Sequence, residues 1–239
     1  MGCCVTAPAR RAVLLDALGV LLELEPPWPP LRAELAARGV AITEDEARTA
    51  LRAEIAYYRA HHDEASDAER LEALRDRCAR VLDAALPPHA RGLPDLRAVL
   101  LASLRFRPYP EVAETLAALR DDGATRLVVV SNWDVSLHGV LADTGLAPLL
   151  DGAITSAECG SSKPDPAIFA RALDLAGGVA PAAAVHAGDM VGADVEGARS
   201  AGIRPVLVAR DGTAACPGVA VLEDLRGLPA LVAAYLPLR

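Results

Sequence analysis

Polar side chains able to do chemistry follow four apolar runs of this sequence, close to the point where each run ends. They supply three carboxylates, one hydroxyl, one amide and one amine. The amine belongs to the only lysine of a chain that otherwise uses arginine. An ammonium is a compact point charge, whereas a guanidinium is a planar fork, so this lysine indicates a site that needs the former. In chain order the side chains are Asp16, Ser131, Asn132, Lys163, Asp189 and Asp194.

This set of side chains suits phosphoryl transfer at a divalent cation. Carboxylates that lie together repel one another and favour a hard cation such as Mg²⁺, for which Asp16, Asp189 and Asp194 are the candidate side chains. The ammonium of Lys163 offsets the remaining negative charge and can hold a carboxylate or a phosphate. Ser131 and nearby backbone N–H groups can donate to phosphoryl oxygens. Asp16 is the candidate nucleophile, of the aspartyl-phosphate type.

The apolar runs predict strands of a parallel sheet that brings these side chains together. Short apolar runs alternate with helical patterns, which is typical of an α/β fold with a Rossmann-like, doubly wound sheet. Ligands of such sheets bind beyond the carboxyl ends of the strands. We expect strands near residues 12–15, 126–130, 153–154, 183–187 and 204–208, and helices near 110–122, 135–145, 166–176 and 193–201.

The region from residue 24 to residue 105 predicts an inserted, all-helical cap. Its periodicity is helical, no strand pattern interrupts it, and the proline-rich stretch 26–30 marks a sharp break at its start. We therefore expect a discontinuous α/β core domain, 1–23 with 106–239, and a helical cap domain over 24–105. The expected cap helices include one after the capping box Thr43–Glu46 and two near 67–86 and 94–104.

Four motifs resemble those of the haloacid dehalogenase-like (HAD) hydrolase superfamily, in the subfamily type with a helical cap after the first strand. The motifs are Leu15–Leu21, Val130–Asn132, Ser156–Phe169 and Gly188–Gly202. The resemblance implies a hydrolase, and we expect a Mg²⁺-dependent phosphatase that acts on a small phosphorylated metabolite.

The resemblance also implies roles for single residues. Asp16 would attack the substrate and bind Mg²⁺, and the backbone carbonyl of Leu18 would be a second metal ligand. Asp189 would be the carboxylate ligand from the fourth motif, and Asp194 a further ligand or a partner of one. Substrate binding falls to Ser131, Asn132 and Lys163, and Lys163 also neutralises the catalytic carboxylates. We assign no role to His186 or Cys159, which we interpret as a strand residue and a small loop residue.

Two positions depart from the pattern of the family's phosphatases. Those enzymes carry a second aspartate two residues after the nucleophile, as general acid and base, and a threonine two residues further on. Here the positions hold Leu18 and Val20. Leucine cannot protonate a leaving alkoxide, and general acid–base help is worth ~10²–10⁴ in rate. The general acid step must therefore be impaired or atypical.

Three functions remain open. The first is a Mg²⁺-dependent phosphatase that acts on an activated substrate or borrows an acid from the cap. The second is a 2-haloacid dehalogenase, because halide needs no acid; those enzymes run without metal and lack the pair kept here as Gly188-Asp189. The third is a catalytically weak member that binds a phosphorylated ligand or a partner protein. A phosphonatase is excluded, because it uses a cap lysine and this cap has none.

One stretch of the cap gathers aromatic and imidazole side chains. Tyr57-Tyr58-Arg59-Ala60-His61-His62 contains half of the tyrosines and two of the five histidines. One interpretation is the end of an amphipathic helix with a solvated face. The other is a substrate-recognition segment in which His61 or His62 reaches the site and supplies the missing acid.

Composition limits the partners and the location. A net charge of −8 and a pI near 5.2 argue against a nucleic-acid surface, and no apolar run is long enough to span a membrane. Five scattered cysteines without metal-ligand spacing indicate a reducing cytoplasm. Met1-Gly2-Cys3-Cys4 fits a loose N-myristoylation pattern, which we do not expect to be used. The sequence does not determine the oligomeric state.

Overall fold

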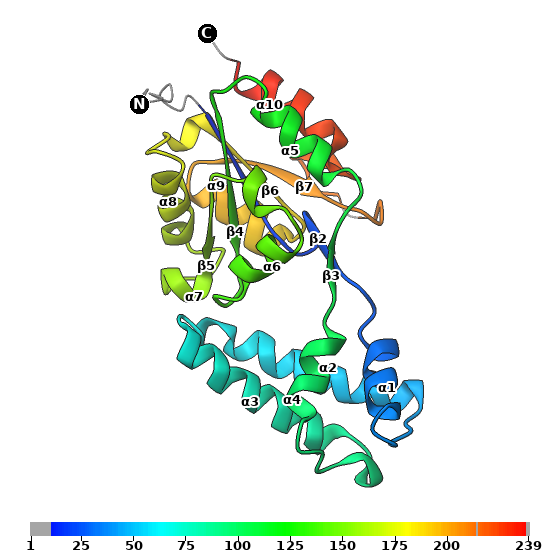
Figure 1. Ribbon diagram of the computed structural model, residues 1–239. Coiled ribbons are helices and arrows are strands. Elements are labelled where there is room, and N and C mark those ends of the chain that lie inside the picture. Colours follow the sequence, from blue (N-terminus) through cyan, green and yellow to red (C-terminus); the bar gives the residue numbers. More distant parts are fainter. Residues whose placement is uncertain (1–10, 214, 238–239) are drawn as a thin grey trace, which may run out of the picture.

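The computed structural model describes residues 11–213 and 215–237, so the Met1-Gly2-Cys3-Cys4 motif lies outside the described residues (Figure 1). Its centre is a parallel six-stranded sheet with the strand order β5-β4-β1-β6-β7-β8. The strands are β1 (Arg11–Leu15), β4 (Thr125–Ser131), β5 (Gly152–Thr155), β6 (Ala184–Gly188), β7 (Arg204–Val208) and β8 (Ala220–Leu222). The predicted Rossmann-like α/β sheet is confirmed.

Helices cover both faces of this sheet, because successive side chains of its strands point to opposite faces. Val13 and Leu15 of β1 belong to one apolar cluster, whereas Ala12 and Leu14 belong to another. The first cluster includes side chains from α5 (Val112–Arg120), α6 (Leu137–Asp143) and α10 (Leu228–Tyr235). The second includes side chains from α8 (Pro166–Leu175) and α9 (Gly197–Ser200). The central strands β1, β4 and β6 are therefore mostly apolar and buried on both sides.

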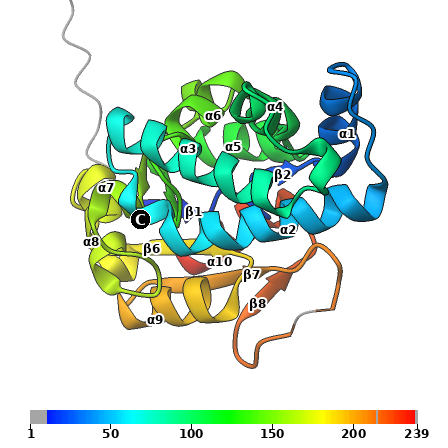
Figure 2. The ribbon, with the colours of Figure 1, turned by 90° about the horizontal axis from the view of Figure 1, so that it is seen from below.

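Four helices form the cap, between β2 (Leu22–Leu24) and β3 (Phe106–Pro108). They are α1 (Trp28–Ala36), α2 (Glu44–His61), α3 (Ala68–Ala85) and α4 (Leu96–Ser103), with the 3₁₀ turn His62–Glu64 after α2. The predicted capping box begins α2, since the Glu46 N–H donates to Thr43 Oγ1 at 3.2 Å and the Thr43 N–H donates to Glu46 Oε2 at 2.7 Å. The cap has its own apolar cluster and lies over the edge of the sheet where β1 and β6 end (Figures 1 and 2).

The structure adds local features that the sequence pattern did not show. The break at the proline-rich stretch is short, because α1 begins at Trp28 and holds its prolines in the first turn, where no N–H is needed. The helix expected over 193–201 is a π-helical turn, Val191–Glu196, followed by α9. β2 and β3 pair as an antiparallel ribbon at the cap boundary, and β8 extends the sheet. These three-residue strands are too short to show a period in the sequence.

No helix in the described part of the chain has the length and apolar character needed to cross a membrane.

Candidate active site at the carboxyl ends of β1, β4 and β6

The sheet register brings the first and fourth motifs together. Leu15 at the end of β1 pairs with Ala187 of β6 on one side and with Val129 of β4 on the other. The Asp16 N–H donates to the carbonyl of Ala187 at 2.9 Å, so the parallel ladder continues one residue past β1. Asp16 is therefore fixed by backbone bonds, and Asp189 leaves the neighbouring strand at the same edge.

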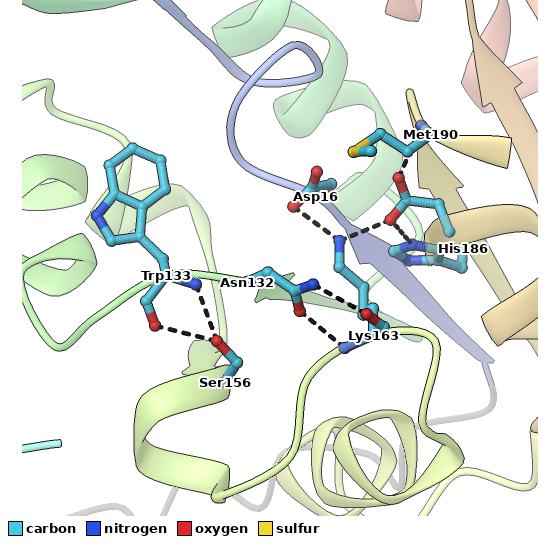
Figure 3. Close-up of polar contacts among 8 residues, drawn as sticks. Asp16, Asn132, Trp133, Ser156, Lys163, His186 and Met190 are labelled. Atoms are coloured by element: carbon cyan, nitrogen blue, oxygen red, sulfur yellow. Dashed lines mark hydrogen bonds and ion pairs between the residues drawn. The ribbon is translucent and has the colours of Figure 1, made fainter. Parts of the chain in front are cut away.

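The ammonium of Lys163 lies between two carboxylates in the interior (Figure 3). Its Nζ is 2.8 Å from Asp16 Oδ1 and 2.6 Å from Asp194 Oδ1, and the residue is only 4% exposed. Burial alone would lower the pKa of Lys163, but the charges of Asp16 and Asp194 and their hydrogen bonds raise it above its ordinary value. The lysine is thus a permanent cation at the centre of the site.

Asp194 receives donors on both carboxylate oxygens. Besides Lys163, the Nε2 atom of His186 lies 2.9 Å from Oδ1, and the Met190 N–H donates to Oδ2 at 2.9 Å. Burial would raise the pKa of Asp194, but Lys163 and the His186 hydrogen bond hold it well below its usual range. Asp194 is therefore a charged residue whose main contacts orient Lys163 and the start of the π-helical turn.

His186 is a site residue that the sequence analysis missed. It is fully buried in β6 and its ring meets the Phe169 ring edge-on at 5.0 Å. The signal in the sequence was a histidine inside an apolar strand, two residues before Gly188 and eight before Asp194. That spacing gains meaning only once the π-helical turn folds Asp194 back over the strand, so that a Cβ on Gly188 would meet Asp194 Cγ at 2.1 Å.

Asn132 holds the main chain of Lys163. Its Nδ2 donates to the Lys163 carbonyl at 2.9 Å, and the Lys163 N–H donates to its Oδ1 at 2.7 Å. Both ends of the amide are engaged, so the side chain fixes the loop from which the lysine extends. Ser131, one residue earlier, ends β4 as a buried residue paired with Thr155 of β5. Its assignment, like that of Asn132, to substrate binding stays a prediction.

Three carboxylates at this edge are arranged as a metal site requires. Oxygen atoms of Asp16, Asp189 and Asp194 all lie within 4.8 Å of one another. Oδ1 of Asp16 is buried and faces the ammonium of Lys163 at 2.8 Å. Partial burial, and then the charges of Asp16 and Asp194, raise the pKa of Asp189 to about 6. The grouping of the three carboxylates and the repulsion between them both fit a hard cation.

Glycine at position 19 is required by this packing. Its φ is +81°, and a Cβ there would lie 2.3 Å from Asp189 Oδ2. Only glycine adopts this conformation without strain and leaves space for the carboxylate. The turn after Asp16 therefore lies directly against Asp189.

Three exposed apolar side chains follow the two strands that carry Asp16 and Asp189. Leu18 is 37% exposed, Met190 is 60% exposed and Val191 is 39% exposed. They account for three of the five large apolar side chains that are exposed among the described residues, and they follow the ends of β1 and β6. The position where the family's phosphatases carry a second aspartate thus holds an exposed leucine, which has no proton to donate.

The cap contacts the core beside Lys163. The carboxylate of Asp63, in the 3₁₀ turn after α2, accepts hydrogen bonds from the hydroxyls of Ser156 and Ser162. The Val135 N–H also donates to the carbonyl of Ala65 at 3.2 Å. A cap carboxylate is therefore hydrogen-bonded to α7 (Ser156–Cys159) and to the loop that carries Lys163.

The two cap histidines are held by nearby groups of the cap. Nδ1 of His61 lies 2.8 Å from the carbonyl of Tyr57, and the two rings stack with their centroids 4.1 Å apart. Nδ1 of His62 lies 3.3 Å from Asp63 Oδ1, and its ring meets Tyr58 edge-on. Their participation in proton transfer stays a prediction.

Comparison with known proteins gives consistent matches. A family model described as haloacid dehalogenase-like hydrolase matches residues 10–202. The chain is 44% identical over 95 residues to "Haloacid dehalogenase-like hydrolase domain-containing protein 3" of Bos taurus, which is 40% of this chain and 37% of that protein. It is 39% identical over 124 residues to the phosphoserine phosphatase of Thermus thermophilus, which is 52% of this chain and 49% of that protein. These matches thus span half or less of either relative.

The fold also matches a solved structure along nearly its whole length. The 2-haloacid dehalogenase from Pseudomonas syringae pv. Tomato DC3000 is 25% identical and superimposes with a TM-score of 0.66. The match covers 95% of this chain and 99% of that one. Similarity therefore extends to proteins named as phosphatases and to proteins named as dehalogenases.

Proposed function

The chain belongs to the haloacid dehalogenase-like hydrolase family, and on that premise we propose that it is a Mg²⁺-dependent phosphatase for activated phosphate esters or anhydrides. The observation that carries the proposal is the position of Lys163 between Asp16 and Asp194, with Asp189 close enough to complete a carboxylate triangle. A site for an uncharged substrate would not need three carboxylates at one point. The phosphatase from Thermus thermophilus supports the same reaction class.

Each residue of the site has a separate role in phosphoryl transfer. Asp16, fixed at the end of β1, attacks phosphorus, forming an acyl phosphate as the bond to the leaving oxygen breaks. Lys163 offsets the negative charge that gathers there, and the Ser131 hydroxyl donates to a phosphoryl oxygen. Asn132 and Asp194 keep the lysine in place through its main chain and its ammonium. Water then attacks phosphorus, which releases phosphate and restores Asp16.

Mg²⁺ would be held by Asp16, Asp189 and the backbone carbonyl of Leu18, and would supply positive charge to the phosphoryl oxygens. Both oxygens of Asp194 already accept hydrogen bonds. We therefore assign Asp194 mainly to positioning Lys163, beside the metal ligands.

Leu18 restricts the substrate to good leaving groups. An alkyl alkoxide must be protonated as it leaves, and a leucine cannot do this. Acyl phosphates and aryl phosphates release a carboxylate or a phenolate. These leaving groups are weak bases and need no acid. We propose that the exposed apolar side chains of Leu18, Met190 and Val191, which follow β1 and β6, favour an aryl group over a polar sugar or glycerol. We therefore expect the rate to depend strongly on the basicity of the leaving group.

A 2-haloacid dehalogenase is the second candidate, because Leu18 is compatible with halide as leaving group and the fold matches a dehalogenase. In that reaction Asp16 would attack carbon and water would hydrolyse the resulting ester. Asp189 beside Asp16 argues against it, since a second carboxylate disfavours the approach of a haloacid anion unless a cation lies between them.

The two reactions separate in a substrate panel with and without Mg²⁺. We expect hydrolysis of acetyl phosphate and 4-nitrophenyl phosphate that is abolished by EDTA and by Asp16→Asn, and slow hydrolysis of glycerol phosphate. Halide release from 2-chloropropionate that resists EDTA would establish the dehalogenase instead. Mg²⁺ binding without turnover of any compound would refute both the phosphatase and the dehalogenase reaction. It would indicate a protein that binds its ligand without turnover.

A further inference from the structure

Arg210 lies two residues after the end of β7, outside the residues that match the family model. Its side chain reaches back to the start of the chain. Nε donates to the carbonyl of Gly19 at 2.9 Å, and Nη2 donates to the carbonyl of Val20 at 2.5 Å. Both carbonyls belong to the turn that follows Asp16. A residue remote in sequence therefore holds the backbone beside the nucleophile.

The same guanidinium contacts the segment that returns from the cap. Its Nη1 lies 2.9 Å from Glu111 Oε1, and its Cζ lies 3.3 Å above the centroid of the Tyr109 ring. Tyr109 follows β3, and its N–H donates to the carbonyl of Leu21 at 3.1 Å. Arg210 thus touches both the turn after Asp16 and the segment that returns from the cap, at the place where the two lie side by side.

These contacts are stronger than those of an ordinary surface arginine. Glu111 is buried, and its Oε1 also accepts from the Leu225 N–H at 3.4 Å. The guanidinium uses its planar fork for two carbonyls and one carboxylate while one face rests on an aromatic ring. A lysine has a single ammonium and cannot make this set of contacts together.

We propose that Arg210 is a positioning residue that couples the segment returning from the cap to the turn after Asp16. The turn lies against the metal site, because Gly19 leaves space only for the carboxylate of Asp189. A displacement of the Gly19 and Val20 carbonyls shifts Leu18, whose own carbonyl is a proposed ligand. Movement of the returning segment therefore changes the geometry at Asp16 and Asp189 through one side chain. The effect on metal binding rests on the proposed function, whereas the coupling itself does not.

The test compares Arg210→Lys and Arg210→Gln with Arg204→Gln in the full chain. Arg204 is a matched control, because its Cζ lies 4.4 Å above the Tyr235 ring while it is placed at the opposite end of β7. Hydrogen exchange is measured by mass spectrometry on peptides covering 17–22 and 106–109, and Mg²⁺ affinity by calorimetry. Loss of a hydrogen bond to a charged group changes an opening equilibrium by about tenfold or more.

We expect both Arg210 variants to raise exchange at 17–22 and 106–109 together by about tenfold and to weaken Mg²⁺ binding by a similar factor. Arg204→Gln should change neither. Faster exchange in only one segment, or spread evenly over the molecule, would overturn the coupling. Coupled exchange with unchanged Mg²⁺ affinity would overturn the positioning role. A wild-type chain that binds no Mg²⁺ would refute the proposed function but leave the exchange result to decide the coupling.

Discussion

The ammonium of Lys163 lies 2.6 Å from Oδ1 of Asp194, and both side chains are almost entirely inaccessible to solvent. Two buried charges are stable only while they face each other, because each has lost its hydration. Asp16, which is also buried, faces the same cation at 2.8 Å. The pair is therefore part of the folded core and also sets the charge beside Asp16, the proposed nucleophile.

Replacing Lys163 by methionine should lower the free energy of unfolding by about 3 kcal/mol or more, since it leaves Asp194 buried without its cation. Urea denaturation at pH 7 measures the change. Arg126→Met is the comparison, because Arg126 faces Asp151 at 3.6 Å in a partly exposed pair and should cost about 1 kcal/mol or less. Equal decreases in the free energy of unfolding of the two variants would show that the Lys163 pair contributes no more than a surface contact.

Asp189 should make the metal-free protein less stable as the pH rises. Its pKa in the folded state is about 6, above the value of ~3.9 in an unfolded chain, so the folded state binds the proton more tightly. The free energy of unfolding therefore falls between about pH 4 and pH 6 and changes little above that. Asp194, whose pKa is lowered, acts in the opposite sense: its contribution is present above about pH 4 and is lost at lower pH.

Urea denaturation in EDTA at a series of pH values from about 4.5 to 7.5 tests this, since the Asp194 effect lies below that window. Asp189→Asn should flatten the curve. A wild-type curve that is already flat, or one that rises with pH, would contradict the assignment of repulsion to this carboxylate.

Leu18→Asp should restore activity toward alkyl phosphates. An acid at this position can protonate the leaving alkoxide, so kcat for glycerol phosphate should rise by ~10²–10⁴, while hydrolysis of 4-nitrophenyl phosphate changes much less. Leu18→Asn has similar size without a proton to give and serves as the control. A gain that appears equally in both variants would assign the effect to polarity or space and not to acid catalysis.

Asp63→Ala should loosen the cap, because Ser156 and Ser162 lose the carboxylate that binds their hydroxyls. We expect a higher KM and faster proteolysis at the cap connections, with a smaller change in kcat. Glu64→Ala removes the neighbouring carboxylate, which pairs with Arg77 inside the cap, and should leave both measurements unchanged. Identical behaviour of the two variants would rule out a specific role for Asp63.

Much of the site could be predicted because it depends on where apolar runs end. Asp16 and Asp189 follow strands that pair directly, so their proximity comes from the parallel register alone. The functions of Asn132 and His186 could not be predicted in this way. The amide of Asn132 binds the main chain of Lys163, and His186 binds Asp194 across a π-helical turn. Neither loop conformation has a periodic signature.

The same limit applies to the fold. The parallel strands of the core are four to seven residues long and buried on both faces, so continuous apolar runs indicate them. β2, β3 and β8 contain three residues each and are recognised only by their partners. The contacts of Arg210 with the turn after Asp16 could not be predicted either, because they join positions about 190 residues apart.

The central claim is that Asp16 accepts a phosphoryl group, and a single turnover in ¹⁸O-labelled water tests it most directly. Excess enzyme is mixed with acetyl phosphate and Mg²⁺, and the reaction is quenched in acid. The masses of the peptide containing Asp16 and of the released phosphate are then determined by mass spectrometry. We predict that early samples carry one phosphoryl group on Asp16 and that ¹⁸O enters the inorganic phosphate but not the Asp16 carboxylate. Phosphate released without any modification of Asp16, or turnover by Asp16→Asn, would contradict the account.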